Sequence, residues 1–340
     1  MARAAWVDQR ETELLPVPYF HVVFTMPQQL ACIALQNKRV MYGILFRAAA
    51  ETLQQLALDP KHLGANIGML MVLHTWGQNL MHHPHVHSVV TGGGISPDGS
   101  RWVACRRTAR KRKPFFIDVR ILSRVYRGKF ISLMKQAYQR GELEFYGQLS
   151  GLVQPAAFER QVDEAVQRNW VVYAKRPFGG PQQVLRYLAR YTHRVAISDH
   201  RLLELKNGQV RFQYKDYADG QQTKDMTLSS SEFIRRFLIH TLPSRFVRIR
   251  YFGFLANRFR KQRLDQCRIL LGMRFDSSKT STQRPSDELD EPQAKPKCPA
   301  CGGGRIRIVD IPSAPRPSTH AIRSPHWSRS MAASGRSPPR

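Results

Sequence analysis

Acidic residues are scarce in this sequence. Among 340 residues, 25 are Asp or Glu and 53 are Lys or Arg, which gives a formal net charge of +28. Such a charge repels basic partners and attracts polyanions, because each phosphate that a protein neutralises releases a condensed counterion. The composition therefore predicts a nucleic acid as the partner, with an anionic membrane surface as the competing interpretation.

Long apolar runs are also missing. The sequence has no stretch of about 18 consecutive apolar residues, which a membrane-spanning helix needs, and no apolar segment of a secretory signal peptide at its N-terminus. These absences disfavour a membrane protein and an exported protein. We expect a cytoplasmic protein with no membrane partner.

Cysteine is sparse and scattered, which does not favour a disulfide framework and agrees with a reducing compartment. Cys298 and Cys301 form a single Cys-x-x-Cys, and no second pair accompanies them, so we do not expect zinc at this position. The five cysteines are Cys32, Cys105, Cys267, Cys298 and Cys301.

Hydrophobic residues make up 42% of the chain, enough for a large core, but they are unevenly distributed. We expect residues 1–18 to be a leader and residues 19–272 to be the catalytic domain. Residues 273–340 are a low-complexity basic tail rich in Pro, Ser and Arg, too poor in apolar residues to offset chain entropy. This tail is expected to be largely disordered.

Strand and helix patterns alternate along the folded part. The sequence predicts an α+β fold, an antiparallel sheet with helices packed on it. The expected strands are 19–25, 69–74, 85–91, 101–105, 169–174, 202–206 and 209–214, with Gly92–Gly94 as a flexible loop at the rim of the site or a simple turn. The expected helices are one or two in 28–58, then 119–140, 158–168, one starting at Pro181, and one capped by Ser231.

Two histidines one residue apart, His85 and His87, lie on one expected strand. Side chains i and i+2 leave a strand on the same face, about 6.5 to 7 Å apart, so both imidazoles can reach one ion. If this strand pairs with 69–74, His74 lies close to His85 and offers a third ligand; His83, beside Pro84, is the rival. Ligand softness alone favours zinc or manganese over magnesium. The alternative is that these histidines decorate a surface turn.

Two tyrosines, Tyr187 and Tyr191, have i, i+4 spacing, so on a helix their phenols share a face about 6 Å apart along the axis. Such a pair alone is typical of core packing. The neighbouring row of the same expected helix is not typical of a core. It contains Arg186, Arg190 and Arg194, which recur at every fourth residue and would be costly to bury. Cations beside phenols suit a scissile phosphate.

A dense basic run precedes Phe115 and includes Arg110, Lys111, Arg112 and Lys113. A solvated loop is always possible for such a run. In a chain this basic, we favour a loop that contacts the backbone of DNA.

The order of these motifs resembles the two-tyrosine HUH rolling-circle transposases of bacterial insertion sequences. The resemblance rests on a His-hydrophobic-His motif followed by Tyr-x-x-x-Tyr, and on three blocks: PYFHVVFTMP ending at Pro27, LHTWGQNLMHHPHVHSVVTGGGISPDGSRWV at 73–103, and RYLARYTHRVAIS at 186–198. It implies an HUH endonuclease fold with a ferredoxin-like or RRM-like core.

The resemblance also implies a chemistry. His85 and His87 would hold a divalent cation, Mg or Mn, which polarises a phosphate of single-stranded DNA at the ends or target of a mobile element. Tyr187 and Tyr191 would be the nucleophiles that form 5′-phosphotyrosine links and free a 3′-OH. His74 as third ligand follows from the expected hairpin, not from the family.

The sequence departs from the family before its first strand, where members usually carry a cysteine-rich zinc module. This leaves open a catalytically inactive DNA-binding remnant. A plasmid replication initiator or relaxase with the same chemistry is a second alternative. A metal-dependent hydrolase that uses activated water is a third.

Overall fold

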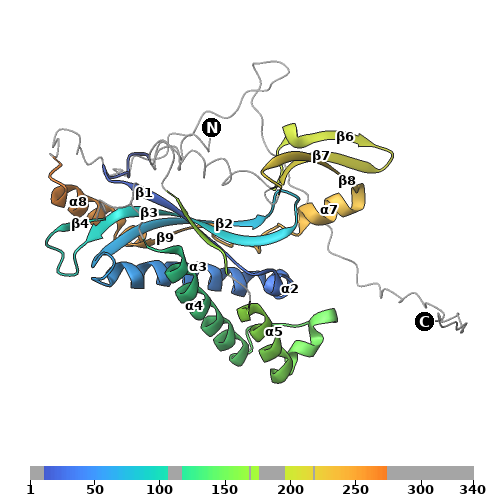
Figure 1. Cartoon of the computed structure of the whole chain (residues 1–340), viewed down its shortest axis with the longest axis horizontal. Helices are drawn as coiled ribbons and strands as arrows, with labels where there is room; N and C mark the ends of the chain where they lie inside the picture. The colour runs from blue at the N-terminus through green and yellow to red at the C-terminus, as the bar shows by residue number, and fades with distance from the viewer. Residues whose placement is uncertain (1–10, 106–116, 168–169, 176–195, 217–218, 274–340) are drawn as a thin grey trace, which may run out of the picture. The chain divides into compact units, whose positions relative to one another are not determined.

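A computed structural model describes residues 11–105, 117–167, 170–175, 196–216 and 219–273. Its main element is a six-stranded antiparallel sheet in the order β5-β1-β3-β2-β9, with β4 paired to the far end of β3 (Figure 1). The expected α+β class is confirmed. The strands are β1 (Tyr19–Thr25), β2 (Asn66–Trp76), β3 (His82–Ile95), β4 (Trp102–Ala104), β5 (Val172–Lys175) and β9 (Ile249–Gly253).

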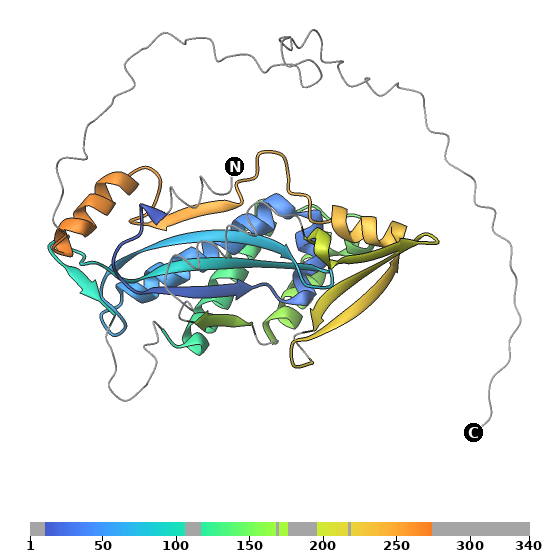
Figure 2. The same cartoon turned by 90° about the horizontal axis from the view of Figure 1, so that it is seen from above.

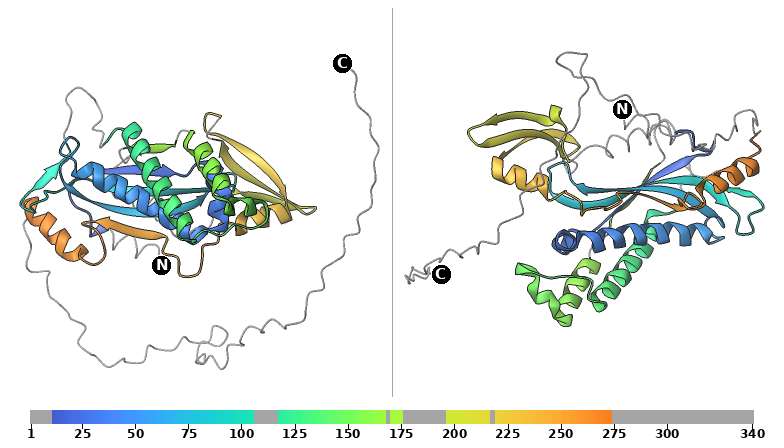
Figure 3. Two further views of the ribbon diagram at one scale, coloured as in Figure 1. Left: turned by 90° about the horizontal axis from the view of Figure 1, so that it is seen from below. Right: turned by 180° about the vertical axis from the view of Figure 1, so that it is seen from behind.

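Helices α2 to α5 lie on one side of this sheet (Figure 1). In the view from below, α3 runs along the strands and α4 crosses it (Figure 3). On α3, a broad apolar surface that includes Tyr42, Leu45 and Leu53 is buried, because the helix contacts the sheet on one side and α4 on another. The helices are α2 (Ala31–Gln36), α3 (Lys38–Leu58), α4 (Val119–Gln139), α5 (Pro155–Gln167), α7 (Ser230–Leu238) and α8 (Arg260–Leu270).

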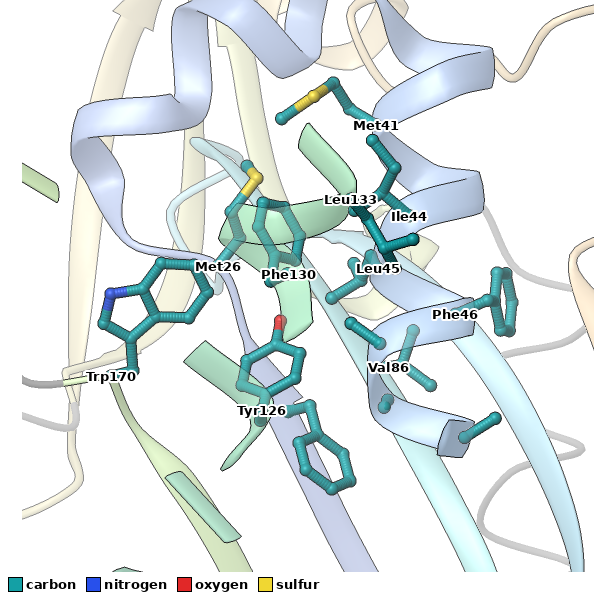
Figure 4. Close-up of a cluster of buried hydrophobic side chains, with 14 of the residues drawn as sticks. Met26, Met41, Ile44, Leu45, Phe46, Val86, Tyr126, Phe130, Leu133 and Trp170 are labelled. Atoms are coloured by element: carbon teal, nitrogen blue, oxygen red, sulfur yellow. The ribbon is translucent and has the colours of Figure 1, made fainter. Parts of the chain in front are cut away.

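The main core lies between this face and the helices (Figure 4). Alternate residues of β3, such as Val86 and Val90, point into it, as period-2 side-chain alternation requires. Tyr126, Phe130 and Trp170 pack edge to face there, with ring centroids 5.1 to 6.0 Å apart. The residues labelled in Figure 4 are Met26, Met41, Ile44, Leu45, Phe46, Val86, Tyr126, Phe130, Leu133 and Trp170.

The other face of the sheet also buries side chains. The set that β3 and β2 present there includes Val89, Leu70 and Val72, which cluster with Tyr19 of β1. This is why β2 is buried over nearly its whole length and its sequence is a continuous apolar run. The two histidines of β3 belong to this face, since they alternate with Val86.

A second, three-stranded antiparallel sheet, in the order β6-β7-β8, precedes α7. Its inner side chains, Phe212 and Met226 among them, pack with Leu80 from the turn between β2 and β3. The small sheet is therefore joined to the hairpin that carries the histidines. Its strands are β6 (Leu202–Lys206), β7 (Gln209–Asp216) and β8 (Gln222–Ser229).

Several expected elements are confirmed, and two assignments were wrong. The strand 19–25 and the hairpin 202–206 with 209–214 are present, and both partners of the histidine hairpin are longer than expected. Gly92–Gly94 is part of β3 rather than a turn: a Cβ at Gly94 would lie 2.2 Å from the Asn66 carbonyl oxygen, so the glycines allow close backbone approach. The cap of α7 is Ser229, whose hydroxyl accepts from the Glu232 amide, not Ser231.

Other expectations fall outside the described residues. These are the helix from Pro181 with its tyrosines and arginines, the basic run at 110–113, and the tail with Cys298 and Cys301. Within the described part of the chain, no helix is both long and apolar enough to cross a membrane.

Candidate metal centre

Three imidazoles converge on the face of the sheet opposite the helices. His74 on β2 is the direct cross-strand partner of His85 on β3, and His87 follows two residues later on the same face. One nitrogen of each ring lies within 4.8 Å of the others. The ring centroids are 4.2 Å apart for His74 and His87, 4.9 Å for His85 and His87, and 5.4 Å for His74 and His85. The predicted hairpin thus brings these three residues together.

Two of the rings are oriented by partners on their outer side. The Nδ1–H of His85 donates to the carbonyl oxygen of His83, 2.6 Å away, and Nδ1 of His87 lies 2.8 Å from Nε2 of His21 on β1. With Nδ1 engaged, Nε2 is the nitrogen that each ring presents to an ion. This arrangement, in which the second nitrogen of a ligating histidine is fixed by a neighbour, is typical of metal sites.

Burial keeps the triad neutral. It lowers the pKa of His85 to about 4, and it lowers the pKa values of His74 and His87 well below the ordinary value of 6.5. The neighbouring histidines lower them further, as does the positive charge of Arg248 for His74. Metal ions bind the neutral imidazole, so the protonation state suits a ligand role at physiological pH.

The residues present therefore fit a divalent cation. Three neutral nitrogens would occupy part of its coordination sphere and leave positions for a phosphate oxygen or water. The structure groups His74 with His85 and His87, whereas His83 contributes its carbonyl oxygen to the orientation of His85. Trp76 stacks on the His74 ring at 5.2 Å with an interplanar angle of 14°.

The turn between β2 and β3 is held from outside by the small sheet and α7. Three successive carbonyl oxygens each accept a hydrogen bond from a different side chain: Gln78 from Arg201, Asn79 from Arg236, and Leu80 from His240. Leu80 has φ of 62° and is fully buried. This turn is therefore fixed rather than a loose hairpin end, and it adjoins the strand ends that carry the triad.

The structure brings together only the histidines among the expected site residues that it describes. Tyr187, Tyr191, Arg186, Arg190, Arg194, Arg110, Lys111, Arg112 and Lys113 lie outside the described residues. Sequence reasoning missed His21 and Trp76. The sequence does carry a signal for both, since each is a ring with a polar N–H group in a strand of mostly apolar residues.

A second histidine pair is buried near the turn and predicts acid sensitivity. Burial lowers the pKa values of His82 and His240 to about 4, and nearby Lys38 lowers both further. His82 also hydrogen-bonds the Tyr42 hydroxyl through Nε2, and His240 contacts Thr75 through Nδ1. Between about pH 4 and pH 6.5, both rings are therefore neutral in the folded protein but charged in the unfolded chain.

Acidification should consequently destabilise the fold. The stabilisation is fully present above about pH 6.5 and is lost as the pH falls toward about 4, because only the unfolded chain takes up these protons there. We expect the free energy of unfolding to fall by roughly 3 kcal/mol between about pH 7 and pH 5 from this pair. Urea unfolding at both pH values measures it. The His82→Gln/His240→Gln variant should show a smaller pH dependence, and an equal dependence would contradict the assignment.

Fold and site together define an α+β protein with a candidate metal centre in a strongly cationic chain. Residues 68–263 match a protein-family model described as "Putative transposase". A "Putative transposase y4qJ" of Sinorhizobium fredii is 51% identical over 317 residues, covering 92% of this chain and 78% of its own length. The chain belongs to this transposase family, as the motif resemblance implied.

A further relative is the transposase of a bacterial insertion sequence. The transposase for insertion sequence element IS801 of Pseudomonas savastanoi pv. phaseolicola is 30% identical over 317 residues, with 90% of this chain and 71% of the relative covered. Both relatives match most of their own length.

Two solved structures of the conjugative relaxase TrwC in complex with oriT DNA, one metal-bound and one metal-free, also align. They cover 51% of this chain and 69% or 70% of their own, at 16% and 15% identity and a TM-score of 0.25. A likeness this slight defines neither the fold nor the activity of this chain.

Proposed function

We propose that this transposase nicks and rejoins single-stranded DNA at the ends and target of a mobile element, by rolling-circle chemistry of the HUH type. The observation that carries the proposal is the triad of His74, His85 and His87, in which one nitrogen of each ring lies within 4.8 Å of the others while Nδ1 of His85 and of His87 has a partner of its own. A divalent cation there, Mg or Mn, would polarise a phosphoryl oxygen and offset the negative charge that develops on it.

Tyr187 and Tyr191 supply the nucleophiles in this proposal. The phenolic oxygen attacks the phosphorus, a Tyr O–P bond forms and the P–O3′ bond breaks, so the 5′ phosphate stays on tyrosine and the departing 3′ oxygen takes a proton. Attack by a 3′-OH on the phosphotyrosine reverses the step and rejoins strands. No external energy source is needed, because one phosphodiester is exchanged for another. The i, i+4 spacing of the two tyrosines supports this role, since both phenols would face one phosphate.

Incubating the purified chain with a labelled single-stranded oligonucleotide from an element end, with and without Mn, tests the proposal. We expect a denaturation-resistant, protease-sensitive protein–DNA adduct together with a shortened fragment that carries a 3′-OH, both dependent on the ion. Salt-dependent binding without an adduct would indicate the catalytically inactive remnant instead. Cleavage at a plasmid origin and not at element ends would indicate a replication initiator or relaxase.

A further inference from the structure

An acid-free basic segment begins inside α7 and extends into α8. Residues 233–264 contain nine Lys or Arg and no Asp or Glu, which is far from the composition of the chain as a whole. Five aromatic residues of this segment, between Phe246 and Phe259, are interleaved with its arginines. None of these residues belongs to the histidine and tyrosine motifs. The segment forms the C-terminal part of α7, strand β9, the start of α8 and the loops between them.

Strand β9 is the last strand of the main sheet on its side (Figure 2). One edge pairs with β2, and no described strand pairs with the other. Its first residue, Ile249, lies opposite Val72, and the preceding Arg248 accepts a hydrogen bond at its carbonyl oxygen from the amide of Leu73, at 3.0 Å. The edge therefore starts next to His74 and runs away from the metal centre.

A groove follows this edge and is lined by cations and rings. Arg39 and Arg245 lie along it, with Phe246, Tyr251 and Phe252. The Arg250 guanidinium is fixed over the rings of Phe46 and Phe246, at 4.4 and 5.0 Å. A fixed cation beside a groove loses little conformational entropy when a phosphate binds.

Guanidinium–ring pairs continue beyond the strand. Arg260 lies over Tyr251 at 4.6 Å, and Arg258 lies over Phe259 at 5.1 Å, with Phe259 51% exposed. Glu13 forms an ion pair with Arg260 at 3.5 Å, so part of this end is neutralised. Arg39, Arg245 and Arg258 are exposed cations, and the exposed ring of Phe259 beside Arg258 is accessible to a ligand.

We propose that this β9 edge surface, defined by Arg39, Arg245, Arg250, Tyr251, Arg258 and Phe259, binds the single-stranded DNA that leads to or from the metal centre. This inference rests on the proposed function. Alternating cations and aromatic rings suit a single strand, because phosphates meet the arginines and unpaired bases stack on the rings. In a duplex the base faces are already stacked and cannot reach Phe259.

The test measures binding without cleavage. Full-length Tyr187→Phe/Tyr191→Phe protein is titrated into fluorescent oligothymidylate without divalent ion, at several salt concentrations. Adding Arg245→Gln and Arg258→Gln should raise Kd about tenfold and reduce the slope of log K against log salt by about 1.4, the value for two lost phosphate contacts. The matched control is Arg120→Gln/Arg124→Gln, two exposed arginines of α4, a helix that contributes no residue to the β9 edge surface; this variant should change Kd less than about twofold.

A second variant separates stacking from charge. Phe259→Leu keeps every charge, and we expect it to weaken binding of the single strand about fivefold or more while leaving the salt slope unchanged. Equal losses in the β9 and α4 arginine variants, or duplex DNA bound as tightly as the single strand, would overturn the proposal. Failure of this proposal differs from failure of the proposed function. If only the β9 surface is wrong, the wild type still forms the adduct and the β9 variants bind DNA with unchanged affinity. If the proposed function is wrong, no adduct forms although DNA binding is normal.

Discussion

Replacement of both Tyr187 and Tyr191 by phenylalanine is expected to abolish the covalent protein–DNA adduct, a loss of at least about a thousandfold in its rate of formation. The change removes two oxygens and leaves ring size and helix propensity almost unaltered. A phenol with a pKa near 10 is only about 0.1% ionised at pH 7, a handicap of roughly 4 kcal/mol. An ion-polarised phosphate and nearby arginines would have to compensate for it.

The single variants sharpen this result. Tyr187→Phe and Tyr191→Phe should each retain one nick but fail to complete strand transfer, if one tyrosine holds each of two successive cleavages. Tyr173→Phe, on β5, is the matched control and should form the adduct at the wild-type rate. Denaturing gels with end-labelled oligonucleotide report the rate. Nicking that persists in the double variant would indicate a hydrolase with activated water and would refute the tyrosine assignment.

Loss of a triad histidine is the second large effect. His85→Ala should remove one of three nitrogens and leave a neutral cavity, so that Mn affinity and adduct formation both fall at least about 100-fold. Because the ring is neutral at physiological pH, this loss is not a change of net charge. Titration calorimetry of the wild type should show one bound Mn per chain.

Two comparisons keep this test specific. His200→Ala removes an exposed histidine and should change neither Mn affinity nor adduct formation. His21→Gln can still accept from Nδ1 of His87, whereas His21→Leu cannot, so the leucine variant should lose roughly 10- to 100-fold more Mn affinity. Unchanged Mn binding in His85→Ala with an intact thermal transition would exclude the triad as the ion site.

Much of the fold was predictable because its local rules are strong. YFHVVFT has β-branched and aromatic residues bounded by a proline turn, and strand β1 has the predicted bounds. Strand β9 was not predicted, since IRYFG carries an arginine on its second residue and owes its strand conformation to pairing with β2. The sequence predicts a loop or turn at the glycines of β3 because nothing local shows that Asn66 and Pro18 approach them.

The grouping of three histidines at the candidate site could be predicted from the sequence, but their partners could not. A period of two placed His85 and His87 on one face, and the expected hairpin placed His74 opposite His85. Register between distant strands could not be predicted, so His21 was missed: β1 pairs with β3 such that Val23 lies opposite His87, and the His21 ring then stacks on the His87 ring, 5.0 Å away. Partners such as Arg201 and His240 come from elements more than a hundred residues later in the chain.

The hydrogen bonds that Arg201, Arg236 and His240 donate to three successive carbonyl oxygens have a consequence for engineering. A hairpin end usually tolerates added residues. Here one inserted residue would move each of the three carbonyl oxygens away from its hydrogen-bond donor and would remove Leu80 from the apolar cluster that it forms with the small sheet. The β2–β3 ribbon therefore cannot be grafted alone onto another sheet as a portable ion-binding unit. Any such transplant must carry the small sheet and α7 with it.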